Sequence, residues 1–170
     1  MELLECHYNA PCGRLVIWSY GNEIVLCDWE QSCGKKKTRI LNTLHKQVVQ
    51  SVSEEADKLS NQLGEYFAGK RRVFDIKHNL IGTEFQKHVW QSLMCIPYGH
   101  TISYSEESAM AGKPNAVRAV GAANGANPIC IVVPCHRVIG KDGHMTGYAG
   151  GVDIKEYLLR LEKGTWRYDV

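Results

Sequence analysis

Hydrophobic and polar residues alternate over the first thirty positions, as is typical of antiparallel strands. Two apolar runs, Leu15–Trp18 and Ile24–Cys27, are separated by Gly21 and Asn22. These two residues tolerate the positive φ angles of a tight hairpin turn, so the pattern predicts two paired strands.

Two helices are predicted after the hairpin and a basic loop, Lys35–Lys37. Ile40, Leu41, Leu44 and Val48 recur at helical spacing. Ser53 is expected to cap a second helix that ends at Gly69, with an inner face made of Ala56, Leu59, Leu63 and Phe67. Val73–Ile76 is expected to return as a strand, which makes residues 1–78 a small α/β domain.

The second half contains two capping boxes, in which a hydroxyl residue precedes a glutamine or glutamate by three positions. Thr83 and Gln86 predict one helix, and Ser103 and Glu106 predict a shorter one that ends at Gly112. The first of these helices carries the apolar residues Phe85, Val89, Trp90 and Leu93.

A third helix of this region is expected to begin at Pro114 and to end near Asn124. The order helix, tight turn, helix is that of a helix-turn-helix motif, and the second helix is made almost entirely of small side chains around Arg118. Such a thin helix could approach a ligand closely, or it could pack tightly against another helix.

A buried strand is predicted at Ile129–Val133, and Asp153 with Glu156 is expected to cap a last helix that ends before Gly164. We therefore expect a second domain, residues 79–170, and an α/β fold class for the whole chain.

Composition narrows the class of protein. The chain has 170 residues, is 44% hydrophobic and 22% charged, and carries a formal net charge of +2, which fits one domain or two small ones. No apolar stretch approaches the roughly 20 residues of a membrane span, and the amino terminus has no signal-peptide pattern. We expect a protein of the bacterial cytoplasm, or of the nucleus if the source is eukaryotic, with its seven cysteines as free thiols.

Charge is unevenly distributed in one segment. No acidic residue occurs from Ser108 to Lys141, where Lys113, Arg118 and Arg137 are also found. This segment could face a polyanion, although chance alone could produce the same distribution.

The candidate nucleophile is Cys135. It leaves a predicted buried strand through Pro134 and is followed by His136 and Arg137, and cationic neighbours favour the reactive thiolate. A carboxylate is needed to orient the histidine, and Glu162 on the last helix is the candidate. The other six cysteines are expected to be inert.

The run Ile131–Ile139 resembles the active-site signature of the O6-alkylguanine-DNA alkyltransferases, or methylated-DNA–protein-cysteine methyltransferases. Further matches to this family occur in its order and spacing at Ser103-Tyr104, Arg118–Gly121, Asn127-Pro128, Gly147–Gly151 and Lys155-Glu156. The resemblance covers residues 83 to 164. It implies a ribonuclease-H-like amino-terminal domain and a winged helix-turn-helix-like carboxy-terminal domain.

The resemblance also implies direct repair of O6-alkylguanine in duplex DNA, and it leaves open whether O4-alkylthymine is a further substrate. The family binds the minor groove and flips the damaged base into a pocket. Arg118 matches the residue that fills the space left by the base, and Tyr104 the residue that drives its rotation. Ser105, Lys113 and Lys141 match positions that contact DNA phosphates.

For the chemistry, Cys135 matches the alkyl acceptor, and His136 with Glu162 matches the relay that removes its proton through a bound water. Tyr104 matches the phenol that donates a hydrogen bond to the leaving guanine. Asn127 matches a hinge, and the pocket residues are Val138, Tyr148 and Ala149. The thioether product has no good leaving group, so each molecule is expected to act once.

The resemblance implies no organic cofactor and no catalytic metal. Some relatives bind zinc, and Cys6, Cys27, Cys33 and His78 are the ligands that could be proposed, although none forms a close ligand pair. The expected partner is duplex DNA rather than a membrane, with the protein acting as a monomer. The main alternative function is a non-catalytic protein that binds alkylation damage. A cysteine hydrolase would not need the helix-turn-helix motif, and a transcription regulator would need more side chains that can read base edges than the small-residue helix offers.

Overall fold

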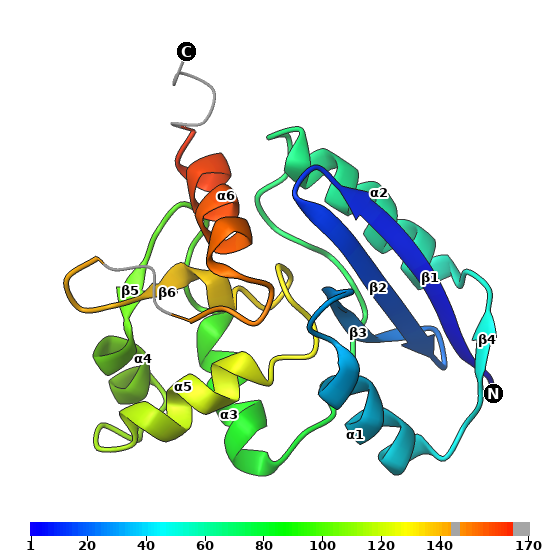
Figure 1. Ribbon diagram of the computed structural model, residues 1–170, viewed down its shortest axis with the longest axis horizontal. Helices are drawn as coiled ribbons and strands as arrows, with labels where there is room; N and C mark the ends of the chain where they lie inside the picture. The colour runs from blue at the N-terminus through cyan, green and yellow to red at the C-terminus, as the bar shows by residue number, and fades with distance from the viewer. Residues whose placement is uncertain (144–146, 165–170) are drawn as a thin grey trace. The chain divides into compact units, whose positions relative to one another are not determined.

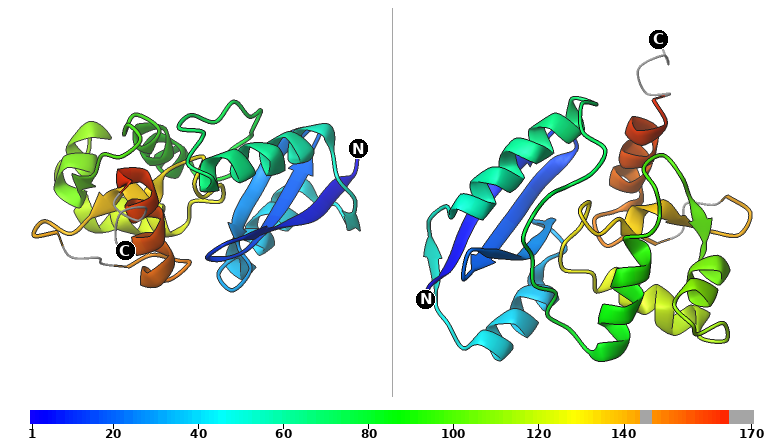
Figure 2. Two further views of the ribbon diagram at one scale, coloured as in Figure 1. Left: turned by 90° about the horizontal axis from the view of Figure 1, so that it is seen from above. Right: turned by 180° about the vertical axis from the view of Figure 1, so that it is seen from behind.

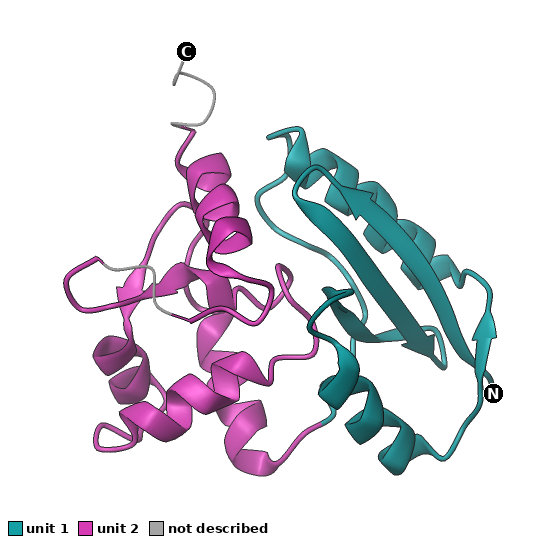
Figure 3. Ribbon diagram, viewed as in Figure 1, with its two compact units in different colours: residues 1–81 teal, residues 82–170 magenta. Residues whose placement is uncertain are grey.

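The computed structural model describes residues 1–143 and 147–164. The chain divides into two compact units, Met1–Ile81 and Gly82–Val170, coloured separately in Figure 3. This division falls three residues after the boundary expected at residue 78. No helix of the described residues is long and apolar enough to cross a membrane.

Unit 1 is built on a four-stranded sheet in the order β3-β2-β1-β4 (Figure 1). Three strands are antiparallel neighbours, and the fourth runs parallel to the first: β1 (Leu3–Ala10), β2 (Gly13–Tyr20), β3 (Glu23–Trp29) and β4 (Val48–Gln50). The predicted hairpin is confirmed, because Gly21 and Asn22 join β2 to β3 with φ angles of 59° and 58°.

Two helices, α1 (Gly34–Leu44) and α2 (Glu54–Phe67), pack against this sheet. Val16 and Trp18 of β2 share a hydrophobic cluster with Ile40 of α1. Their neighbours along the strand point to the opposite face and are also buried, so both faces of β2 are covered. The predicted Ser53 cap is confirmed by a hydrogen bond of 3.0 Å from the Ala56 amide to the Ser53 hydroxyl.

Three expectations for this half are wrong. Lys35–Lys37 lies inside α1 rather than in a loop, and Val48 begins β4 rather than continuing the helix. The helix ends earlier because His45 adopts a left-handed conformation, with φ 53°, and returns its amide to the Leu41 carbonyl. Val73–Ile76 forms no strand. The segment that follows it forms an isolated bridge to β3, between His78 and Ile24.

The described residues of unit 2 form four α-helices: α3 (Glu84–Leu93), α4 (Tyr104–Met110), α5 (Val117–Gly125) and α6 (Val152–Lys163). Both predicted capping boxes are confirmed, at Thr83 for α3 and at Ser103 for α4. Helices α3, α4 and α5 contact one another and lie side by side in Figures 1 and 2. Their shared core is small and apolar, made of Val89, Ala111, Val120, Ala123 and the partly buried Phe85.

Two helix starts differ from prediction. Helix α5 begins at Val117, because Pro114 belongs to a turn closed by a 3.0 Å hydrogen bond from the Ala116 amide to the Lys113 carbonyl. No side chain caps α5. Helix α6 begins after Gly151, whose φ of 103° suits glycine, so Asp153 lies in the first turn instead of capping it.

The run Ile129–Val133 is buried as predicted but is not a strand. Ile131 has a left-handed φ of 72°, and the Val133 amide returns to the Ile129 carbonyl at 3.0 Å, so the run folds into a tight turn. The chain then enters the short 3-10 helix η1 (Cys135–Arg137). Strand β6 (Val138–Ile139) follows and pairs in parallel with β5 (Ile102–Ser103), immediately before α4.

Candidate active site

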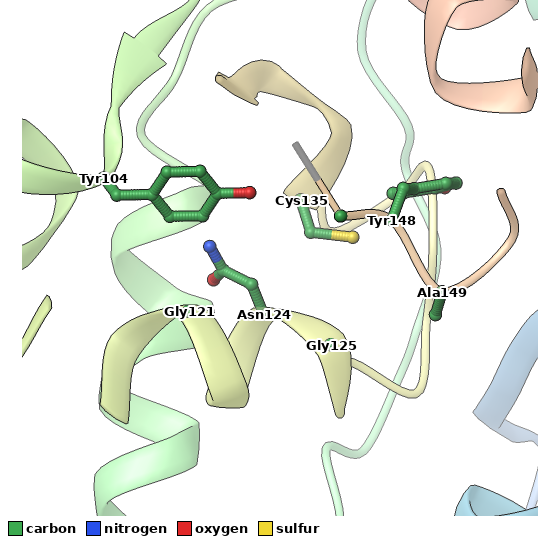
Figure 4. A pocket seen from close by; sticks show the side chains of 8 residues that line it. Tyr104, Gly121, Asn124, Gly125, Cys135, Tyr148 and Ala149 are labelled. Atoms are coloured by element: carbon green, nitrogen blue, oxygen red, sulfur yellow. The ribbon is translucent and has the colours of Figure 1, made fainter. Parts of the chain in front are cut away.

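A cavity of about 520 Å³ opens within unit 2 beside Cys135. Its walls come from α4, α5, η1 and the segment before α6, through Tyr104, Gly121, Asn124, Gly125, Cys135, Gly147, Tyr148 and Ala149. In Figure 4 the Tyr104 hydroxyl points towards Cys135, and the Asn124 side chain extends from α5 towards Tyr104. Glycines and an alanine occupy much of the wall, so a flat aromatic group can enter without displacing large side chains.

Cys135 lies at the first position of η1 and is 7% exposed. The buried Asn127 side chain fixes the turn that leads to it. Its amide nitrogen donates to the Val133 carbonyl at 2.8 Å, and its oxygen accepts the Ile129 amide at 3.0 Å. The predicted hinge residue therefore joins the end of α5 to the segment that carries the cysteine.

His136 and Glu162, predicted as a pair from distant parts of the sequence, are in contact. His136 Nε2 lies 2.6 Å from Glu162 Oε2, and both side chains are almost completely buried. Arg137 donates to the same carboxylate from Nε at 2.8 Å and from Nη2 at 3.1 Å, and its Nη1 donates to the Ile96 carbonyl at 2.7 Å. The sequence marked Arg137 only as a cationic neighbour, whereas the structure makes it the second partner of Glu162.

These contacts set the charge of Glu162. Burial opposes its ionisation, but the charges and hydrogen bonds of His136 and Arg137 outweigh burial and hold the pKa of Glu162 well below its ordinary 4.5. Since an ionised carboxylate can only accept, Nε2 of His136 carries the proton. The other ring nitrogen, Nδ1, is buried and makes no hydrogen bond within the described part of the chain.

Tyr104 and Lys155 form a second group at the pocket. The Lys155 ammonium lies 5.8 Å from the centre of the Tyr104 ring, and the lysine is fully buried. Burial lowers the pKa of Lys155, whereas Cys135 and Glu107 act to raise it. No chemical role is predicted for Lys155 from the sequence, because a lysine in an amphipathic helix is usually exposed.

Glu107 and Asn124 were missed altogether by the sequence interpretation. Glu107 on α4 is 0% exposed, and its Oε1 accepts a hydrogen bond of 2.6 Å from Asn124 Nδ2. Burial raises the pKa of Glu107 to about 7, and Cys135 acts in the same direction against Asn124 and Lys155. The signal was present in the helical spacing, since position 107 lies on the same side of α4 as Ala111, which belongs to the core.

The four predicted phosphate-contacting or DNA-entering residues are all exposed. Arg118 lies in the first turn of α5 and Ser105 in the first turn of α4, while Lys113 lies between these helices. Lys141 lies in the turn after β6. None of the four is among the residues that line the cavity, which suits a surface role rather than a role in the pocket.

Of the three predicted pocket residues, Tyr148 and Ala149 line the cavity. Val138 is fully buried in β6 and is not among the lining residues, so its predicted contact with a base depends on its backbone carbonyl.

The four possible zinc ligands do not form a site. No group of three or more His, Cys, Asp or Glu side chains within residues 1–143 and 147–164 could hold a metal ion. Cys33 Sγ donates to the Glu30 carbonyl at 3.4 Å, and His78 Nδ1 lies 3.0 Å from the Ile76 carbonyl. Burial raises the pKa of the Cys27 thiol, which disfavours the thiolate that zinc binds. All seven cysteines are free thiols, as expected.

Comparison with known proteins gives consistent matches. Residues 84–164 match the family model described as 6-O-methylguanine DNA methyltransferase, DNA binding domain. The methylated-DNA–protein-cysteine methyltransferase of Methanosarcina barkeri is 56% identical over 108 residues, which are 64% of this chain and 68% of the relative. The enzyme of the same name from Salmonella typhimurium is 44% identical over 165 residues, 95% of this chain and 96% of the relative.

Solved structures agree with these sequence matches. The crystal structure of Mycobacterium tuberculosis O6-methylguanine methyltransferase superimposes with a TM-score of 0.80 at 40% identity, over 96% of this chain and 93% of that one. The complex of M. tuberculosis OGT with DNA gives a TM-score of 0.81 at 39% identity, over 96% and 94% of the two chains. Since the similarity to the Salmonella enzyme extends along almost the whole of both sequences, the chain belongs to the methylated-DNA–protein-cysteine methyltransferase family.

Proposed function

We propose that this protein repairs O6-alkylguanine in duplex DNA by transferring the alkyl group irreversibly to Cys135. The observation that carries this proposal is the arrangement around the thiol. Cys135 lies at a cavity large enough for a purine, and the next residue, His136, is held by a buried carboxylate.

The first step is removal of the thiol proton. Glu162 accepts a hydrogen bond from the Nε2–H group of His136, so the lone pair of the neutral imidazole is on Nδ1, and this nitrogen takes up the proton of Cys135 through a bound water. Arg137 helps to keep Glu162 ionised, and the ionised carboxylate stabilises the imidazolium that forms.

The second step is displacement at carbon. The Cys135 thiolate attacks the alkyl carbon, a carbon–sulfur bond forms, and the bond between that carbon and guanine O6 breaks with its electron pair on the base. Tyr104 donates a hydrogen bond from its hydroxyl to the developing guanine anion, which then takes up a proton. The thioether offers no leaving group for release, so one molecule repairs one lesion.

DNA binding is assigned to unit 2. Helices α4 and α5 are the elements that face the duplex. Ser105 and Arg118 are exposed in the first turns of these helices, and Lys113 is exposed between them. Arg118 fills the space of the extruded guanine, and Lys141 contacts a phosphate. The small residues of α5, with Gly121 at the cavity wall, let the base pass close to the helix backbone.

We also propose a specific fold type for each of the two units. Unit 1 is ribonuclease-H-like, supported by three antiparallel strands with a fourth, parallel strand beside β1. Unit 2 is winged helix-turn-helix-like, supported by the α4–α5 pair and the β5–β6 ladder. We further propose that the protein acts as a monomer, which sedimentation of the DNA complex tests.

Mass spectrometry of the intact protein tests the proposed reaction. After incubation with a duplex that contains one O6-methylguanine, we expect one added methyl group per protein, located on Cys135 by peptide analysis. Cys135→Ala should remain unmodified, whereas Cys95→Ala, which removes an exposed thiol, should be methylated like the wild type. Tight binding of the lesion without transfer would instead indicate a damage-binding protein, and neither binding nor transfer would refute the proposed function.

A further inference from the structure

A buried carboxylic acid lies behind the pocket wall, where the proposed reaction gives it no role. Glu107 is one turn from Tyr104 on α4 and is fully buried. Its Oε1 accepts from Asn124, while its Oε2 makes no hydrogen bond to any residue the structure describes. A buried carboxylate with one oxygen unpaired is costly, so a purely structural role would be served better by an apolar side chain.

Asn124 connects this acid to the cavity. It lines the pocket together with Tyr104 and Cys135, and its side chain lies between α5 and Tyr104 in Figure 4. Its Nδ2 donates to Glu107 at 2.6 Å, which holds the carboxyl group in place behind the wall. The Asn124 oxygen is buried and, among the described residues, has no hydrogen-bond partner either.

Glu107 also interacts electrostatically with the reacting thiol. The pKa of Glu107 rises to about 7 mainly because of burial, with Cys135 acting in the same direction and Lys155 opposing it. The pKa of Lys155 reflects the same interactions, because Cys135 and Glu107 both favour its charged ammonium form. Two groups that can become anionic, Cys135 and Glu107, therefore interact with the same buried cation, Lys155.

Other charged groups near α4 are in different environments. Helix α3, which packs against α4, carries Glu84 and His88 on its exposed surface, and its Lys87 lies 3.5 Å from Glu84. Glu106 is the capping-box partner of Ser103. Arg118 of α5 is exposed, and β5 and β6 carry no titratable side chain.

We propose that Glu107 tunes alkyl transfer: held behind the pocket wall by Asn124, its carboxylate opposes the Cys135 thiolate and competes with it for the charge of Lys155. When Glu107 is protonated, Lys155 stabilises the thiolate alone. When Glu107 is ionised, part of that stabilisation is lost and the thiolate is less populated. This inference depends on the proposed transfer to Cys135.

The pH dependence of single-turnover transfer tests the inference. We would measure benzyl transfer from free O6-benzylguanine between pH 5.5 and 9 for the wild type and for Glu107→Gln, which keeps an oxygen to accept from Asn124. Glu55→Gln is the matched control, because Glu55 is a buried glutamate of unit 1 that binds the Lys77 amide.

We expect Glu107→Gln and the wild type to react at equal rates near pH 6, where Glu107 is protonated. Above pH 8 the variant should be faster by about threefold or more, because it lacks the opposing charge. Glu55→Gln should keep a constant ratio to the wild type at every pH. A ratio of Glu107→Gln to wild type that does not change with pH would overturn the inference.

A second measurement uses only the wild-type chain and covers the case in which Glu107→Gln does not fold. The carboxyl carbon of Glu107 is titrated by NMR before and after stoichiometric benzylation of Cys135. Benzylation removes the thiolate charge, so the titration midpoint of Glu107 should fall by about half a pH unit or more. An unchanged midpoint would overturn the inference, whereas failure of the wild type to become benzylated or methylated at any pH would refute the proposed function itself.

Discussion

Replacement of Glu162 by glutamine should lower the stability of unit 2 strongly, although the side chain keeps its size and shape. Its two carboxylate oxygens accept four hydrogen bonds: Oε1 from Arg137 Nε at 2.8 Å and from the Gly99 amide at 3.3 Å, and Oε2 from His136 at 2.6 Å and Arg137 Nη2 at 3.1 Å. Glu162→Gln keeps the volume but replaces one acceptor oxygen by an NH2 group. Two of the four donors then face another donor, and the buried Arg137 loses its counter-charge.

Breaking a buried ion pair on one side costs about 3–5 kcal/mol. Stabilities of domains are typically about 5–15 kcal/mol, so the variant should lose a large share of the stability of unit 2. The measurement is urea-induced unfolding followed by the fluorescence of Trp90, in a background where the other three tryptophans, Trp18, Trp29 and Trp166, are replaced by phenylalanine.

Glu156→Gln is the matched control on the same helix. Its carboxylate is 2.8 Å from Arg160, but both side chains are nearly half exposed, so its loss should be less than about 0.5 kcal/mol. If Glu162→Gln costs less than about 1 kcal/mol in the same background, the carboxylate does not organise His136 and Arg137 as described, and the argument for proton transfer through His136 fails with it.

Three further predictions follow from the same structure. The stability difference between the wild type and Glu162→Gln should be fully present above the ordinary carboxyl pKa of 4.5, and it should shrink as the pH falls towards the depressed pKa of folded Glu162. Urea unfolding midpoints of both proteins between pH 2.5 and 7 measure this difference, and a difference that grows on acidification would contradict the prediction. Arg118→Ala should slow transfer from duplex DNA far more than from free O6-benzylguanine, because only the duplex requires base extrusion, and equal losses in the two single-turnover assays would assign Arg118 a structural role. Gly82→Ala should lower the melting temperature, since a Cβ there would lie 2.4 Å from the ring of the buried Trp90 and overpacking costs about 1–3 kcal/mol; an unchanged melting temperature would mean that the ring moves freely.

Features set by a few neighbouring residues were predicted well from the sequence. The capping boxes at Thr83 and Ser103 and the hairpin at Gly21-Asn22 depend on local hydrogen bonds and local φ angles, and all three are present. The contact of His136 with Glu162 was found through the family resemblance and the need for a carboxylate, since nothing in the spacing of 26 residues predicts it.

Features that depend on tertiary packing were predicted poorly. Ile129–Val133 is as apolar as a buried strand, but the left-handed Ile131 and the Asn127 side chain bend it into a turn. No chemical role was predicted for Glu107 or Lys155, because charged residues in helices are usually solvated. Only the folded chain shows that both are buried near Cys135, where charge matters most for the chemistry.

The short ladder between β5 and β6 brackets a segment of the chain that could be exchanged with the corresponding segment of a relative. It pairs Ile102 with Val138 and Ser103 with Ile139, so residues 104–137 form a closed segment that holds α4, α5 and Cys135. Such a segment is a natural cassette for exchange, because its two ends already lie on adjacent strands. A chimaera that imported it alone would place it against the last helix of the recipient, whereas transfer of α6 with it keeps the native contact of His136 with Glu162 and the native position of Lys155.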